Sequence, residues 1–64
     1  MERWISNLCR RLDHKLSLLS PEHFHSVRLK FGAAVGFLMM HKAGWVLTRS
    51  AITELAELER FLDA

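Results

Sequence analysis

The feature that most limits the fold of this chain is an uncharged run, FGAAVGFLMM, from Phe31 to Met40. A helical segment that is apolar on every face has no side for water, so it has to be covered all round. A chain of 64 residues has little material for that cover. The sequence therefore predicts that the protein completes its core by self-association or with a partner.

Composition limits the other ways of stabilising so small a chain. Cys9 is the only cysteine, so no disulfide can form within the chain, and a single thiol suits a reducing compartment. The apolar run is half the roughly 20 residues that a bilayer-spanning helix needs, and no signal-peptide pattern opens the sequence. We expect a cytoplasmic protein with no membrane partner and no cofactor, folded as one helical domain over residues 1–64.

Apolar spacing predicts an all-α protein with three helices, over about residues 2–19, 21–43 and 48–62. The first helix has the clearest apolar face, formed by Trp4, Leu8, Leu12, Leu16 and Leu19. These residues recur at intervals of three and four, which places them on one side of a helix. No alternating pattern typical of a strand competes with this interpretation.

Local signals set the predicted helix boundaries. Ser20 can cap a helix, Pro21 suits the first helical position and Glu22 favours the positive end of the helix dipole. The first two helices should therefore form an antiparallel hairpin. Gly44 is a plausible end for the second helix, although one long helix across it stays open. Residues 45–47 are too apolar for a mobile linker and are either a packed corner or helical.

Two glycines four residues apart predict a close helix contact in the apolar run. Glycine inside a helix costs about 1 kcal/mol relative to alanine, so a close backbone approach is the natural compensation. We predict a homodimeric helical bundle, and the sequence leaves open whether the glycines pack within one chain or between chains. The predicted self-association residues are Phe31, Gly32, Val35, Gly36 and Met39.

Catalysis and metal binding find little support in the sequence. The histidines lack ligand spacing for a metal site, and no serine or cysteine stands in a catalytic motif. We therefore expect no enzymatic activity and no bound metal, and we expect a protein–protein interaction module: an adaptor, a chaperone-like subunit or a regulator. Trp4 and Trp45 are the candidate partner-binding hot spots, because tryptophan is favoured at the centre of interfaces.

The alternative function is that of a dimeric nucleic-acid-binding regulator. The polar side of the first predicted helix carries four basic residues that could follow a line of phosphates: Arg3, Arg10, Arg11 and Lys15. Glu2 and Asp13 dilute this basic face, and no aromatic residue lies among its cations to stack on bases.

A second indication of DNA binding comes from the run from Leu47 to Thr53, followed by Leu55. This run, LTRSAIT, resembles the turn and recognition helix of winged-helix regulators of the MarR type. The resemblance implies a helix that enters DNA, but Lys42 and Val46 stand where that pattern has a small residue and a glycine. The acidic residues of the following helix would also repel phosphates, so no DNA-contacting residue is carried over from the family.

Overall fold

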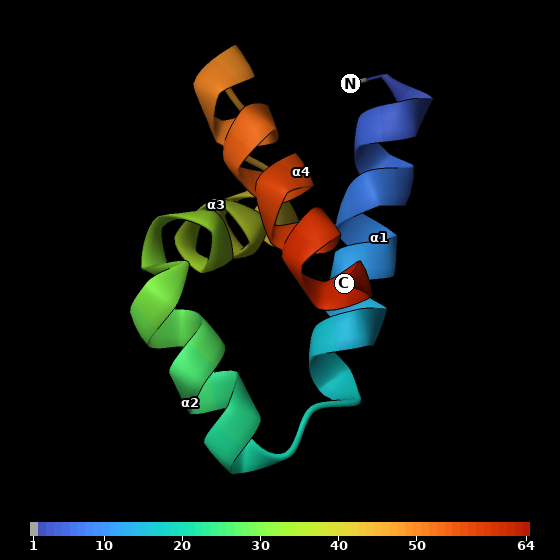
Figure 1. The fold of residues 1–64 in the computed structure, drawn as a ribbon. Helices are drawn as coiled ribbons and strands as arrows, with labels where there is room; N and C mark the ends of the chain where they lie inside the picture. Colours follow the sequence, from blue (N-terminus) through green and yellow to red (C-terminus); the bar gives the residue numbers. More distant parts are fainter. Residues whose placement is uncertain (1) are drawn as a thin grey trace.

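The computed structural model describes residues 2–64, and helices account for most of them (Figure 1). They are α1 (Arg3–Ser17), α2 (Pro21–Lys30), α3 (Gly32–Lys42) and α4 (Arg49–Asp63). No strand occurs among residues 2–64. The predicted all-α class is confirmed, and the molecule measures 32 × 20 × 17 Å.

The prediction of a single helix over residues 21–43 is wrong, because the backbone breaks at Phe31. The φ and ψ angles of Phe31 are −120° and 40°, outside the helical region. The bend turns α3 away from the direction of α2 (Figure 1), so Val27 of α2 and Leu38 of α3 both reach the core. Residues 2–64 therefore form four helices in place of the three predicted.

Side-chain caps begin α2 and α4 where the sequence placed their starts. The backbone N–H of His23 donates a hydrogen bond of 3.2 Å to Ser20 Oγ, and that of Ala51 donates one of 3.2 Å to Thr48 Oγ1. Each bond satisfies one of the backbone donors that a helix leaves without a partner at its N-terminus. Both helix starts are confirmed.

A non-helical corner connects α3 to α4, so residues 45–47 are not helical, and of these three only Leu47 packs into the core. Gly44 has a φ of 93°, which glycine tolerates and which ends α3. The N–H of Trp45 then donates a bond of 3.0 Å to the carbonyl of Met40. Leu47 is buried, whereas Trp45 and Val46 are exposed, so the corner sends one side chain inward and two outward.

The helix α4 occupies the centre of the molecule, with α1 and α3 packed against it. Leu12 from α1 and Leu55 and Leu58 from α4 are the largest fully buried side chains. The chain reverses direction between α1 and α2, as the predicted hairpin requires, but these two helices do not form the main contact. Instead α1 packs against α4 and α3, while α2 packs against α3.

Candidate protein-binding surfaces

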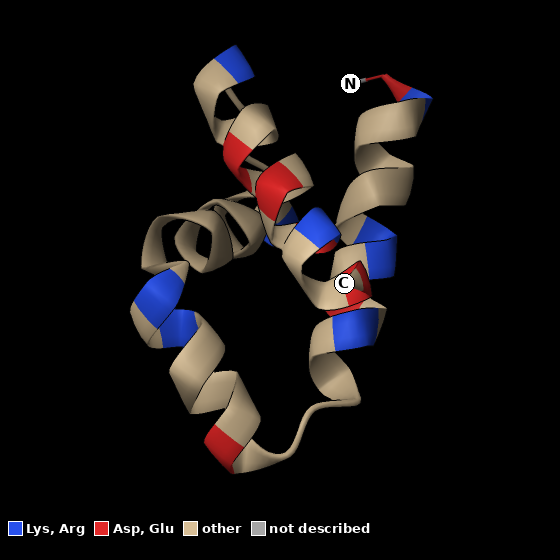
Figure 2. Ribbon diagram, viewed as in Figure 1, with Lys and Arg blue, Asp and Glu red and all other residues tan. Residues whose placement is uncertain are grey.

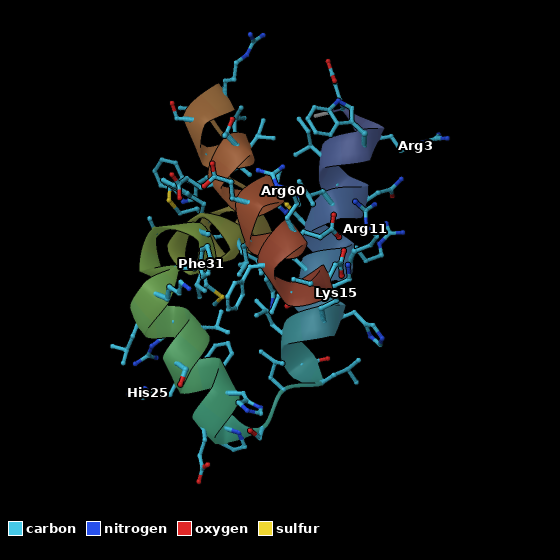
Figure 3. All side chains as sticks on the ribbon, viewed as in Figure 1. Arg3, Arg11, Lys15, His25, Phe31 and Arg60 are labelled. Atoms are coloured by element: carbon cyan, nitrogen blue, oxygen red, sulfur yellow. The ribbon has the colours of Figure 1, made fainter. Side chains whose placement is uncertain are left out.

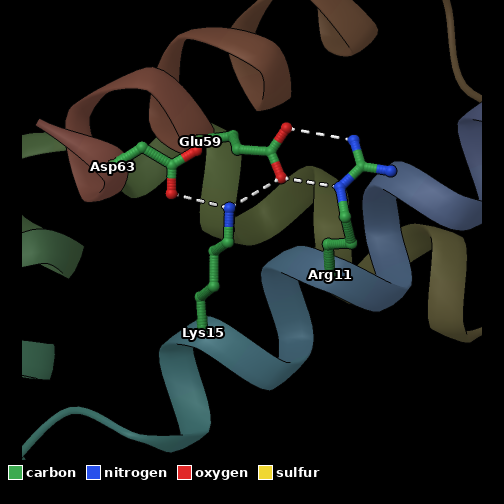
Figure 4. A network of polar contacts seen from close by, with 4 residues as sticks. All are labelled: Arg11, Lys15, Glu59 and Asp63. Carbon is green, nitrogen blue, oxygen red and sulfur yellow. Dashed lines mark hydrogen bonds and ion pairs between the residues drawn. The ribbon is translucent and has the colours of Figure 1, made fainter.

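The helices α1 and α4 run in the same direction (Figure 1). Ion pairs join them near their C-terminal ends (Figure 4). Arg11 donates two hydrogen bonds to the carboxylate of Glu59, at 3.0 and 3.1 Å. Lys15 Nζ lies 3.0 Å from Glu59 Oε2 and 2.7 Å from Asp63 Oδ1. We call these four residues the ion-pair clasp. Arg11 and Lys15 are four residues apart in α1, and Glu59 and Asp63 are four residues apart in α4. Each helix therefore presents its charges on successive turns of one face.

Hydrogen bonds from Arg11, and next from Lys15, lower the pKa of Glu59 from 4.5 to about 2. Partial burial acts in the opposite direction and is outweighed. The Glu59 side chain is only 17% exposed. It connects α4 to Arg11 of α1, 48 residues away in the chain.

At the opposite end, α1 and α4 diverge (Figure 1), and a largely apolar groove lies between them. We call it the α1–α4 groove. Its volume is about 730 Å³, within the range of ligand-binding pockets. Its lining residues are Glu2, Trp4, Ile5, Val46, Leu47, Arg49, Ile52, Thr53, Ala56 and Arg60. One helix pair thus has a polar closed end and an apolar open end.

The two predicted hot-spot tryptophans both lie on the surface, at different places. Trp4 is 54% exposed and lines the α1–α4 groove, where its indole N–H donates a hydrogen bond to the carboxylate of Glu2. Trp45 is 63% exposed and lies in the corner after α3. The structure therefore makes Trp4 part of a concave site and leaves Trp45 outside it.

A second apolar surface lies on α3, on the side turned away from the core. We call it the outer face of α3; its residues are Gly32, Ala33, Gly36, Met39 and Met40, all exposed. A Cβ atom built on Gly32 or Gly36 would meet nothing within 4 Å. No other helix of residues 2–64 therefore packs closely on either glycine.

The predicted self-association residues are divided by the structure. Gly32, Gly36 and Met39 point outward on the outer face of α3. Val35 is buried in the core, and Phe31 packs against Phe61 with the ring centroids 4.9 Å apart. The last two side chains serve the chain's own fold because the break at Phe31 turns them inward.

The four basic residues of α1 do not form one uniform surface. Arg3 and Arg10 are exposed on α1, whereas Arg11 and Lys15 belong to the ion-pair clasp. Figure 2 shows the acidic residues at the end of α4 beside the basic segments of α1. Half of the predicted phosphate-binding cations therefore already contact carboxylates.

Cys9 is buried, and burial raises the pKa of its thiol. A buried neutral thiol is a poor nucleophile. Within residues 2–64, no three His, Cys, Asp or Glu side chains gather as a metal site would require.

Sequence reasoning missed both the ion-pair clasp and the α1–α4 groove. The signal for the clasp was present: Arg11 and Lys15 share the spacing of Glu59 and Asp63. Only the parallel packing of α1 on α4 shows that these pairs meet. The groove had no comparable signal, because its residues come from two stretches far apart in the sequence, residues 2–5 and 46–60.

No protein-family model, no curated protein and no solved structure matches this chain. The MarR-type resemblance therefore has no support from these comparisons, and residues 2–64 contain no strand that could form a wing. Across the same residues, no helix combines the length and apolar character needed to cross a membrane.

Proposed function

We propose that this chain is a small non-enzymatic protein–protein interaction module that acts as a homodimer. The observation that carries the proposal is the outer face of α3, which is exposed and uncharged. Two copies could approach closely across Gly32 and Gly36, since neither glycine is covered by its own chain. Exposed apolar surface rimmed by polar residues is typical of protein interaction sites.

Charge also favours α3 over the other helices as a self-association surface. In Figure 2 the α3 ribbon is almost free of charged residues, whereas α1, α2 and α4 all carry them. Two identical charged faces repel each other, but two uncharged faces meet without that cost. Met39 and Met40 add flexible thioether side chains that adapt to a partner surface.

Light scattering tests the homodimer directly. We expect a mass of two chains at micromolar concentration, and a mass of one chain would contradict self-association. Gly36→Leu should convert the dimer to monomer, because the new side chain blocks the close approach but meets open space in its own chain. Ser50→Leu places the same side chain at an exposed position of α4 and should leave the dimer intact.

The nucleic-acid alternative has less support, because the ion-pair clasp occupies Arg11 and Lys15. A titration with labelled duplex DNA and RNA at two salt concentrations tests it. Binding that weakens steeply with salt and is lost in Arg3→Glu/Arg10→Glu would favour this alternative. Both residues are exposed, so the variant should fold.

A further inference from the structure

The α1–α4 groove is lined mainly by apolar side chains. It lies between two helices of the same direction that diverge toward their N-terminal ends (Figure 1). Its apolar lining includes Trp4 and Ile5 from α1, Val46 from the corner and Ile52 from α4. Val46 is 83% exposed and Trp4 more than half exposed, so these side chains are accessible to a partner. An amphipathic helix laid into an apolar groove is a recurring recognition mode.

Charge around the groove indicates the chemistry of that helix. Arg49 and Arg60 both line it, and Figure 3 shows Arg60 on the side of α4 toward α1. Within residues 2–64, neither guanidinium lies in a salt bridge, in contrast to Arg11 in the clasp. The single carboxylate of the lining, Glu2, already accepts a hydrogen bond from Trp4. The groove therefore offers two cations to a ligand and one carboxylate that is already bonded.

The distance between the two arginines also limits the ligand. Arg49 and Arg60 are eleven positions apart in α4, which corresponds to roughly 16 Å along the helix axis. Ile52 and Ala56 lie between them at helical intervals of three and four, on the same face of α4. A ligand helix aligned with α4 would therefore place apolar side chains between two acidic ends.

We propose that the α1–α4 groove binds an acidic amphipathic helix of a partner protein. Its apolar anchors lie three and four residues apart, and acidic residues about three turns apart face Arg49 and Arg60. This inference rests on the proposed function as an interaction module, but it does not depend on self-association through α3. The two can therefore fail independently.

Selection from a displayed library of helical peptides tests the proposal. Each peptide carries fixed leucines three and four residues apart, and each flanking position is either glutamate or lysine. We expect enrichment of glutamate at positions about eleven residues apart. Enrichment of lysine, or no enrichment over a library with serine anchors, would overturn the proposal.

Charge-reversal variants then test whether the selected peptide binds in the groove. We expect Arg49→Glu/Arg60→Glu to weaken binding of the glutamate peptide about tenfold, because two exposed ion pairs are lost. The same variant should bind the corresponding lysine peptide instead. Arg10→Glu/Arg28→Glu reverses two exposed cations outside the groove and is the matched control. Equal weakening in the control would contradict the site.

A second variant addresses the apolar part of the groove. Val46→Asp changes an exposed side chain, so the fold should persist, and binding should fall at least tenfold. Unchanged binding would overturn the proposal. Sedimentation of the same samples without peptide reports self-association separately: a dimer that binds no peptide removes the groove proposal only, and a monomer that binds peptide removes the homodimer only.

Discussion

The two ends of the α1–α4 pair differ in what holds the helices together. At the closed end, fully buried leucines lie beside the ion-pair clasp. At the open end, the helices diverge and apolar side chains such as Trp4 and Val46 remain in contact with solvent. The closed end therefore has the features of a folding contact, and the open end those of a binding surface. A small chain can use one helix pair for both purposes because different faces and turns of each helix meet different surroundings.

The largest expected difference between the two ends is in core packing. Leu12→Ala should lower the free energy of unfolding by about 3 kcal/mol, because it leaves a cavity around a side chain that is 0% exposed. Trp4→Ala should lower it by less than about 1 kcal/mol, since Trp4 is largely outside the core. Urea denaturation of both variants measures the difference. Equal losses of unfolding free energy in the two variants would contradict the difference between a folding contact and a binding surface.

The ion-pair clasp should contribute less than the core. Glu59→Gln should lower the free energy of unfolding by about 1–2 kcal/mol, a value reduced by the solvent exposure of Arg11 and Asp63. Glu57→Gln changes an exposed carboxylate outside any salt bridge among residues 2–64, and it should have little effect. A similar loss in both variants would show that the clasp adds nothing specific.

The contribution of Glu59 should also depend on pH. Its pKa is about 2 in the folded chain and about 4.5 without the clasp. The folded state therefore favours the ionised form, and this stabilisation is complete above pH 4.5 and is lost as the pH falls through 2. The stability difference between the wild type and Glu59→Gln should shrink over this interval. A difference that stays constant down to pH 2 would argue against the clasp.

An effect smaller than that of the clasp is expected at the start of α4, which borders the open end. Thr48→Ala removes the hydrogen bond to the N–H of Ala51 and should cost about 1 kcal/mol. Thr48→Ser keeps a capping hydroxyl and serves as the control. Thermal unfolding of the two variants checks the effect, and an equal loss in both would mean that the cap is not what stabilises this helix end.

Short-range features of the sequence predicted the local structure well. Ser20 and Pro21 start a helix as expected, Gly44 ends one, and the leucine spacing of the first helix identifies its buried face. These signals work because capping and periodicity depend on residues a few positions apart. The break at Phe31 was missed because the apolar run around it has no polar face, so its periodicity does not show where one helix stops and the next begins.

Contacts between residues far apart in the sequence could be identified only from the tertiary structure. The sequence alone determined an all-helical chain without internal disulfides and with more apolar surface than it can bury. Only the packing of α1 against α4 decided that Arg11 and Lys15 meet Glu59 and Asp63, so that these basic residues are bonded within the chain. The same packing gathered Trp4, Val46 and Ile52 into one groove. Contacts between residues more than forty positions apart depend on the relative direction of whole helices, which no local pattern encodes.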